Sequence, residues 1–198
     1  MFASVRLNSP KSGFIVWVDL WVEECDVEEL VKEYGSPLLI ISESQFRQSF
    51  RQFKKAFTDN YNGEVEILYA NKSNNSLALR HIMNQEGGGG DCFGVNEMYI
   101  SLLAGTNPKM LVLNGSNKQD EELEMAIANG LCINIDSMDE LTRISDISTR
   151  LNKSVEIGIR LALDLDSLAD KTGVFMHGPG TLKEQSDSTK WGMSREQT

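Results

Sequence analysis

Short apolar segments alternate with longer amphipathic ones along most of this chain, and this alternation restricts its possible folds more than any other feature. In the longer segments apolar residues recur every three or four positions, which is the spacing of one face of a helix. Successive apolar segments end about 20 to 25 residues apart, the length of a strand–helix unit in a parallel sheet. The sequence therefore predicts an α/β fold, with strands at 65–70, 92–93, 110–113, 131–135 and 155–163.

Helices are expected between these strands, and several carry recognisable boundary signals. Ser42 can cap a helix that follows a further strand at 38–41, and four phenylalanines of this helix fall on one face. Ser137 and Glu140 have the spacing of a capping box. Three helices are expected to start at Ser42, at Asn75 or Ser76, and at Asn96. Two further helices are expected to cover 120–129, where Gly130 ends the helix, and 137–151.

Two parallel architectures fit this alternation, an open doubly wound sheet and a closed (β/α)8 barrel. A dinucleotide-binding sheet should carry GxGxxG directly after its first strand, whereas the glycine run 87–90 precedes a strand. Active sites of barrels are built from the carboxyl ends of several strands. The barrel is favoured because polar residues follow or end successive strands, namely Lys72, Asp91, Asn114, Asp136 and Arg160.

The length of the chain bears on its domain organisation. Its 198 residues fall short of the about 250 residues of a typical complete barrel. We therefore expect an incomplete barrel over 36–198, preceded by a strand–helix segment at 1–35 on the side of a β-domain. The C-terminal β-domain itself is expected to be absent from this chain. After residue 163, glycines, a proline and scattered charges predict a long loop.

Composition excludes several classes of function. A net charge of -10 without a basic cluster argues against nucleic acid as a partner. Cys25, Cys92 and Cys132 are far apart and form no CxxC pair, so neither a metal site nor a disulfide framework is expected. A reducing compartment, the cytoplasm, is the simplest interpretation. Membrane association is not expected, because no apolar stretch approaches the roughly 20 residues of a membrane span.

Lys72 is the strongest candidate for chemistry. It directly follows an apolar strand, within the segment Tyr-Ala-Asn-Lys-Ser-Asn at 69–74. An amine shielded from water becomes a nucleophile toward an aldehyde, as a Schiff-base lysine must be. From the residues alone, a lysine that points to solvent from a loop remains the alternative interpretation.

The segment around Lys72 resembles the cofactor-lysine motif Tyr-Ala-x-Lys-x-Asn of the pyridoxal-phosphate (PLP) enzymes with an alanine-racemase-like barrel. It is most similar to the group IV amino-acid decarboxylases of the diaminopimelate and ornithine type. The resemblance extends from about residue 27 to 193, and the segments at 114–118 and 190–193 favour the diaminopimelate branch. Further matching segments follow in order at 34–37, 90–97, 114–123, 134–137, 159–160 and 190–193.

The resemblance implies a PLP-dependent carboxy-lyase, similar to the diaminopimelate decarboxylase of lysine biosynthesis, that acts on a small amino acid as a homodimer. Lys72 would hold the cofactor as a Schiff base, and Asp91 and Arg160 would lie near it. From the residues alone, Asp91 could instead cap a helix and Arg160 could be a salt-bridge partner. His177 lies in the predicted loop and is not assigned the role of the family's ring-stacking histidine.

Other functions stay open at this point. An ornithine, arginine or lysine decarboxylase of polyamine synthesis and a PLP racemase of the same fold are the enzyme alternatives. A non-catalytic homologue that acts by binding a protein is the alternative from another class. Because the family's glycine-rich phosphate site would follow Thr198, we expect the isolated chain to be inactive.

Overall fold

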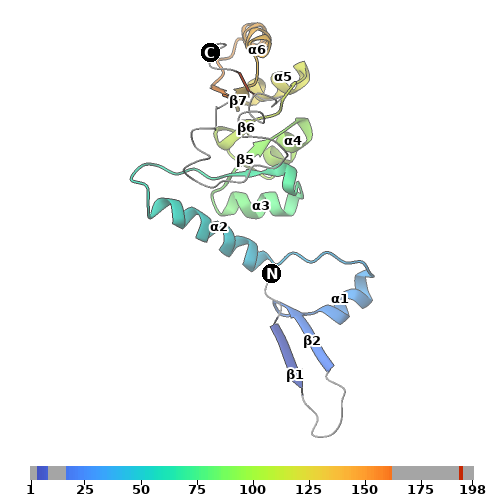
Figure 1. Ribbon diagram of the computed structural model, residues 1–198. Coiled ribbons are helices and arrows are strands. Elements are labelled where there is room, and N and C mark those ends of the chain that lie inside the picture. The colour runs from blue at the N-terminus through green and yellow to red at the C-terminus, as the bar shows by residue number, and fades with distance from the viewer. Residues whose placement is uncertain (1–3, 9–16, 162–191, 194–198) are drawn as a thin grey trace, which may run out of the picture. The chain divides into compact units, whose positions relative to one another are not determined.

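The computed structural model describes residues 4–8, 17–161 and 192–193. Contacts divide the chain into two compact units, Met1–Val65 and Glu66–Thr198 (Figure 1). The domain boundary expected between residues 35 and 36 stays a prediction, since a compact unit of this chain need not be a domain of a complete protein. The predicted loop after residue 163, with His177, lies outside the described residues.

The first unit combines a small antiparallel sheet with two helices. Asp26 caps the first helix, because its Oδ1 accepts from the N–H of Glu28 at 2.7 Å. Ser42 caps the second, as predicted, since its Oγ accepts from the N–H of Gln45 at 3.1 Å. The elements are β1 (Ser4–Asn8), β2 (Trp17–Val22), β3 (Cys25–Asp26), α1 (Val27–Tyr34) and α2 (Glu43–Thr58).

The strand predicted at 38–41 is wrong, because these residues form no regular element. A strand needs a neighbour that pairs with its N–H and C=O groups, and no described strand pairs with this segment. The apolar side chains are accordingly left open, with Leu39 95% exposed and Ile41 51% exposed. An apolar sequence alone therefore did not make this segment a strand.

The second unit is a parallel five-stranded sheet with one α-helix between each pair of consecutive strands (Figure 1). The strands are β4 (Leu68–Ala70), β5 (Gly89–Cys92), β6 (Leu111–Leu113), β7 (Cys132–Ile135) and β8 (Ile157–Ile159). The helices are α3 (Leu77–Gln85), α4 (Val95–Leu103), α5 (Asp120–Asn129) and α6 (Met138–Leu151), with 3-10 turns η1 (Asn71–Ser73) and η2 (Pro108–Met110).

The order of the strands distinguishes the two architectures that the sequence left open. The order β4-β5-β6-β7-β8 follows the chain without reversal, whereas a doubly wound sheet reverses its order in the middle. Right-handed crossovers that always add the next strand on the same side keep every helix on one face. Consecutive helices from α3 to α6 do contact one another. The α/β class is confirmed, and the arrangement is that of part of a barrel.

The core of this unit lies between the sheet and its helices. Alternate strand residues are almost fully buried, among them Leu111, Leu113 and Ile133, and they pack against apolar residues of α4, α5 and α6. Because side chains alternate across a strand, Val112 and Asn134 face the opposite side, where they are half-buried. This opposite face is the one that a barrel encloses, and the candidate site lies on the same side of the sheet.

Gly90 in β5 makes room for a buried polar cluster behind the sheet. Arg80, which is 1% exposed, donates from Nη1 to the carbonyl of Gly89 at 2.6 Å and also donates to the carbonyl of Gly88. A Cβ at Gly90 would lie 2.8 Å from Cδ2 of Leu111 and 3.1 Å from Nδ2 of Asn71. The glycine run therefore forms part of a strand, which begins earlier than the predicted 92–93.

We expect Gly90→Ala to lower the free energy of unfolding by about 1 to 3 kcal/mol, the usual cost of an overpacked core. The added methyl group would meet the tightly packed side chain of Leu111 and the hydrogen-bonded side chain of Asn71, and neither can move away without losing contacts. Urea unfolding followed by circular dichroism would measure the loss. A variant as stable as the parent would show that the cluster of Arg80 and Asn71 adapts freely.

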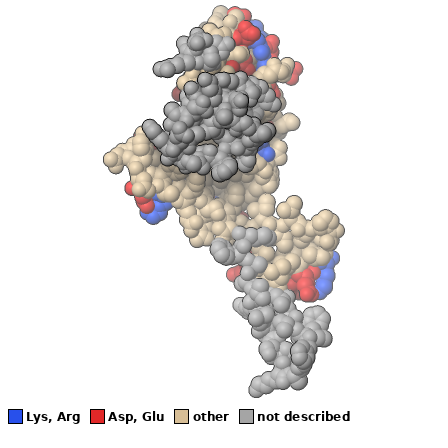
Figure 2. Space-filling view, in the orientation of Figure 1, with Lys and Arg blue, Asp and Glu red and all other residues tan. Residues whose placement is uncertain are grey.

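Many charged side chains on the visible surface lie close to a side chain of opposite charge. Several of the Lys and Arg side chains seen in Figure 2 lie beside Asp or Glu side chains. The ion pair of Arg150 with Glu124 has a separation of 3.0 Å, and its two side chains are 57% and 42% exposed. Exposed pairs of this kind contribute little to stability. None of the helices among the described residues is both long enough and apolar enough to cross a membrane.

Candidate functional site

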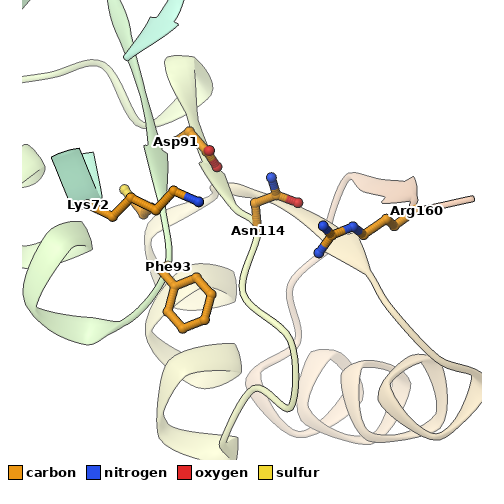
Figure 3. Close-up of a pocket in the computed structure, with 6 residues that line it drawn as sticks. Lys72, Asp91, Phe93, Asn114 and Arg160 are labelled. Atoms are coloured by element: carbon orange, nitrogen blue, oxygen red, sulfur yellow. The ribbon is translucent and has the colours of Figure 1, made fainter. Parts of the chain in front are cut away.

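Lys72 lies in η1, the single turn that directly follows β4. Its neighbour Asn71 is anchored behind the sheet, where Nδ2 donates to Oγ of Ser101 at 2.8 Å. The Lys72 side chain extends from the turn toward Asp91 and Asn114 (Figure 3). Its location after a strand is the predicted one. The side chain is exposed, so the described residues alone do not shield the amine from water as the chemical argument required.

Asp91 lies in β5 and points to the same side as Lys72 (Figure 3). Burial raises the pKa of its carboxyl group, against the opposing effects of a hydrogen bond with Asn114 and of the positive charges of Lys72 and Arg160. Its Oδ1 is buried and has no hydrogen-bond partner among the described residues. Asp91 is not the cap of the next helix, because the N-cap of α4 is Gly94.

The raised pKa of Asp91 predicts how its replacement changes stability with pH. A carboxyl group whose folded pKa lies above its ordinary value of 3.8 stabilises the fold at low pH. This contribution is lost as the pH rises through the folded pKa. Asn resembles the protonated carboxyl group, so Asp91→Asn should gain stability relative to the parent between about pH 3 and pH 7. Urea unfolding across this range would measure the difference, and a difference that does not change with pH would contradict it.

Two asparagines connect Asp91 to the later strands. Asn114 follows β6, and its Oδ1 accepts from Nδ2 of Asn134 on β7 at 3.1 Å. Gly158 on β8 leaves space for Asn134, since a Cβ there would lie 2.1 Å from Oδ1 of that side chain. The strand-end pattern singled out Asn114, but sequence reasoning assigned a role neither to it nor to Asn134. Both are amides on the inward face of neighbouring strands.

Arg160 directly follows β8, and its backbone N–H donates to the carbonyl of Ile135 at 3.0 Å. Its guanidinium Nη1 lies 3.4 Å from Oδ1 of Asp136. The same side chain reaches toward Asn114 from the side opposite Lys72 (Figure 3). Arg160 therefore has the ion-pair partner that the simpler interpretation expected, and it also lies at the candidate site.

The structure brings the three predicted site residues together in one cavity of about 80 Å³ (Figure 3). They come from the carboxyl ends of the first, second and fifth strands of the sheet. Phe93, which is 50% exposed and which sequence reasoning did not select, lies below the amine of Lys72 in Figure 3. The cavity is lined by Lys72, Asp91, Cys92, Phe93, Asn114 and Arg160.

This arrangement suits an anionic ligand that carries an aldehyde. The Lys72 amine can attack the aldehyde, and the positive charge of Arg160 can compensate a negative one. Asp91 Oδ1 has no donor among the described residues and can accept from a hydroxyl or N–H group of the ligand. The residues present therefore fit PLP. Among the described residues, no group of three or more His, Cys, Asp or Glu side chains could hold a metal ion.

Cys92 is not a nucleophile of this site. It is fully buried, and burial is the main cause that raises the pKa of its thiol to about 11. Its Sγ accepts from Nδ2 of Asn71 at 3.3 Å on the helix side of the sheet. Cys92 is therefore a small residue of the core.

The structure contains a buried ion pair behind the site that the sequence did not predict. Lys118 is fully buried, and its Nζ lies 2.8 Å from Oε2 of Glu140. The predicted capping box is only half formed. Ser137 Oγ accepts from the N–H of Glu140 at 3.3 Å, but the Glu140 carboxylate accepts from the N–H of Asp136 at 2.9 Å. The spacing of Ser137 and Glu140 was the one local signal that Glu140 had a structural role.

Comparison with known proteins gives consistent matches. Residues 43–194 match the family described as pyridoxal-dependent decarboxylase, pyridoxal binding domain. The diaminopimelate decarboxylase of Archaeoglobus fulgidus is 38% identical over 147 residues, which are 74% of this chain and 34% of that protein. That of Methanothermobacter thermautotrophicus is 37% identical over 148 residues, 75% and 33% of the two chains. The chain thus spans about a third of the length of these relatives.

Solved structures agree with these relatives. The diaminopimelate decarboxylase of M. jannaschii in complex with L-lysine is 25% identical, with a TM-score of 0.79 over 98% of this chain and 42% of that one. The diaminopimelate decarboxylase of Helicobacter pylori in complex with L-lysine is 30% identical, with a TM-score of 0.64 over 69% and 34%.

Proposed function

Since the chain belongs to the family of pyridoxal-dependent decarboxylases, we propose that it is the PLP-binding part of a diaminopimelate decarboxylase. The observation that carries the proposal is the meeting of Lys72, Asp91 and Arg160 in one cavity at the strand ends. The relatives named above support the choice of substrate, as do the sequence segments at 114–118 and 190–193.

The three predicted site residues would have roles that follow from their chemistry. Lys72 would hold the cofactor covalently through Nζ, and Arg160 would balance its negative charge. Asp91 would accept a hydrogen bond from the cofactor at Oδ1. Because burial raises its pKa, Asp91 can also hold a proton beside the Lys72 amine more readily than an ordinary carboxylate can. PLP, when bound, supplies the electron sink that makes loss of carbon dioxide possible.

The organisation of the complete enzyme is part of the same proposal. We propose a cytoplasmic homodimer in which residues 1–35 join a β-domain and 36–198 contribute to the barrel. The resemblance to the decarboxylase family supports the dimer and the β-domain. The widely spaced cysteines, which are free in the structure, support a reducing compartment.

Carbon dioxide release by the complete enzyme, with PLP and one amino acid at a time, tests the proposed activity. We expect diaminopimelate to be decarboxylated with the highest kcat/KM among diaminopimelate, ornithine, lysine and arginine. Preference for ornithine, arginine or lysine would move the chain to the polyamine branch. Lys72-dependent binding of PLP without release from any substrate would instead favour a racemase or a non-catalytic homologue.

A further inference from the structure

Asp136 does not line the cavity itself, but it contacts Arg160, which does. It directly follows β7, next to Arg160 at the end of the neighbouring strand. Its Oδ1 lies 3.4 Å from Nη1 of Arg160, and the Asp136 side chain is only 10% exposed. We propose that Asp136 is a positioning residue that directs the guanidinium of Arg160 into the cavity and thereby sets the affinity for PLP. This inference rests on the proposed function.

Asp136 is itself held from behind by the buried ion pair. Its backbone N–H donates to Oε2 of Glu140 at 2.9 Å, and the same oxygen lies 2.8 Å from Nζ of Lys118. Glu140 and Lys118 are both buried, at 3% and 0% exposure. Charge-assisted hydrogen bonds in a dry site are strong and directional. The backbone of Asp136 is therefore held in place. A side chain can orient a second side chain only if its own backbone is fixed.

Oδ1 of Asp136, which contacts Arg160, also forms a hydrogen bond with a third segment of the chain, residues 192–193. Oδ1 accepts from the N–H of Gly192 at 2.9 Å. The next residue, Met193, donates its N–H to the carbonyl of Arg160 at 2.8 Å and forms a parallel bridge with Leu161. One carboxylate oxygen thus ties the ends of β7 and β8 to the segment that continues the sheet. Arg160 is consequently fixed at both its backbone and its guanidinium.

Positioning and simple electrostatics predict opposite effects when Asp136 is replaced. Asp136 carries a negative charge near a cavity for an anionic ligand, so as a mere charge it would repel that ligand. Its removal would then tighten PLP binding. If Asp136 instead orients Arg160, its removal lets the guanidinium turn away and weakens binding. We expect the second effect to dominate, because Asp136 contacts Arg160 directly.

The test is an absorption titration of the complete enzyme with PLP, in which the Lys72-dependent band reports binding. We expect Asp136→Ala to weaken PLP affinity by about tenfold, comparable to the loss of residues that orient metal ligands. Asp136→Asn keeps an acceptor oxygen and should lose less. In an Arg160→Ala background, Asp136→Ala should have little further effect, because coupled residues are not additive. Asp139→Ala, at an exposed position of the same segment, is the matched control and should bind PLP as the parent does.

The outcomes separate the two proposals. A Lys72-dependent band in the parent with unchanged or tighter binding in both Asp136 variants would overturn the positioning role and leave the proposed function standing. An equal loss in the presence and absence of Arg160 would also overturn it, since the effect would then not pass through Arg160. If Asp136→Ala does not fold, Asp136→Asn decides between the two directions. A parent without a Lys72-dependent band would end the proposed function and this inference together.

Discussion

Lys72→Ala is expected to lower the decarboxylase activity of the complete enzyme by roughly 10⁴-fold or more, the order of loss when a covalently acting group is removed. Among the residues that the structure describes, Lys72 is the lysine that lines the cavity, where Asp91 and Arg160 meet it. Without its amine, the cofactor would lose both its covalent attachment and a group that exchanges protons beside Asp91. Activity with diaminopimelate and the visible absorption band of bound PLP would be measured on the same sample.

Lys109 offers a matched control for this prediction. It is also an exposed lysine in a 3-10 turn, η2, but this turn precedes a strand instead of following one. Lys109 therefore lies at the amino end of β6, away from the end where the cavity forms. Lys109→Ala should keep both activity and absorption band. Activity retained in Lys72→Ala would contradict the assignment, as would equal losses in the two variants.

Glu140→Ala is expected to destabilise the protein by about 3 to 5 kcal/mol, because it leaves the ammonium group of Lys118 buried without its partner. The cost is large because Lys118 is fully buried and its Nζ lies 2.8 Å from Glu140. The same change removes the acceptor for the N–H groups of Lys118 and Asp136. A loss of this size is a large part of the 5 to 15 kcal/mol that typically stabilises a domain. Urea unfolding would measure it.

The exposed pair of Arg150 and Glu124 is the control for the buried one. Its atoms lie 3.0 Å apart, similar to the buried pair, but both side chains are largely exposed. Glu124→Ala should change the free energy of unfolding by at most about 1 kcal/mol. Replacing both buried partners, as in Lys118→Met with Glu140→Leu, should recover part of the loss. Similar losses for the buried and exposed pairs would show that Lys118 reaches water in solution.

The sequence predicted the elements whose stability is local or whose burial is complete. The helix at 120–129 was predicted at its observed limits, and Ser137 caps α6 as expected. Strands buried against helices read as apolar runs, which is why β6 and β7 were found. The segment at 38–41 has the same appearance but no partner among the described strands, and pairing is not encoded locally. The start of β5 was missed because glycine is a poor predictor of a strand.

Some residues of the candidate site could be predicted from the sequence, and others could not. Lys72, Asp91 and Arg160 could be selected because they lie at strand ends and because the surrounding motifs resemble the decarboxylase family, a resemblance that the family match confirms. The partnership of Glu140 with Lys118 could not be predicted, because the partners are 22 residues apart and no local pattern joins them. The roles proposed for the site residues remain predictions.

The most direct test of the central claim is to find which residue of the complete enzyme holds PLP. The enzyme is incubated with PLP, reduced with borohydride and digested, and the modified peptides are identified by mass spectrometry. We predict a single major site of modification at Lys72, within the peptide that contains residues 69–74. Labelling at another lysine, or labelling spread over many lysines with Lys72 unmodified, would contradict the account.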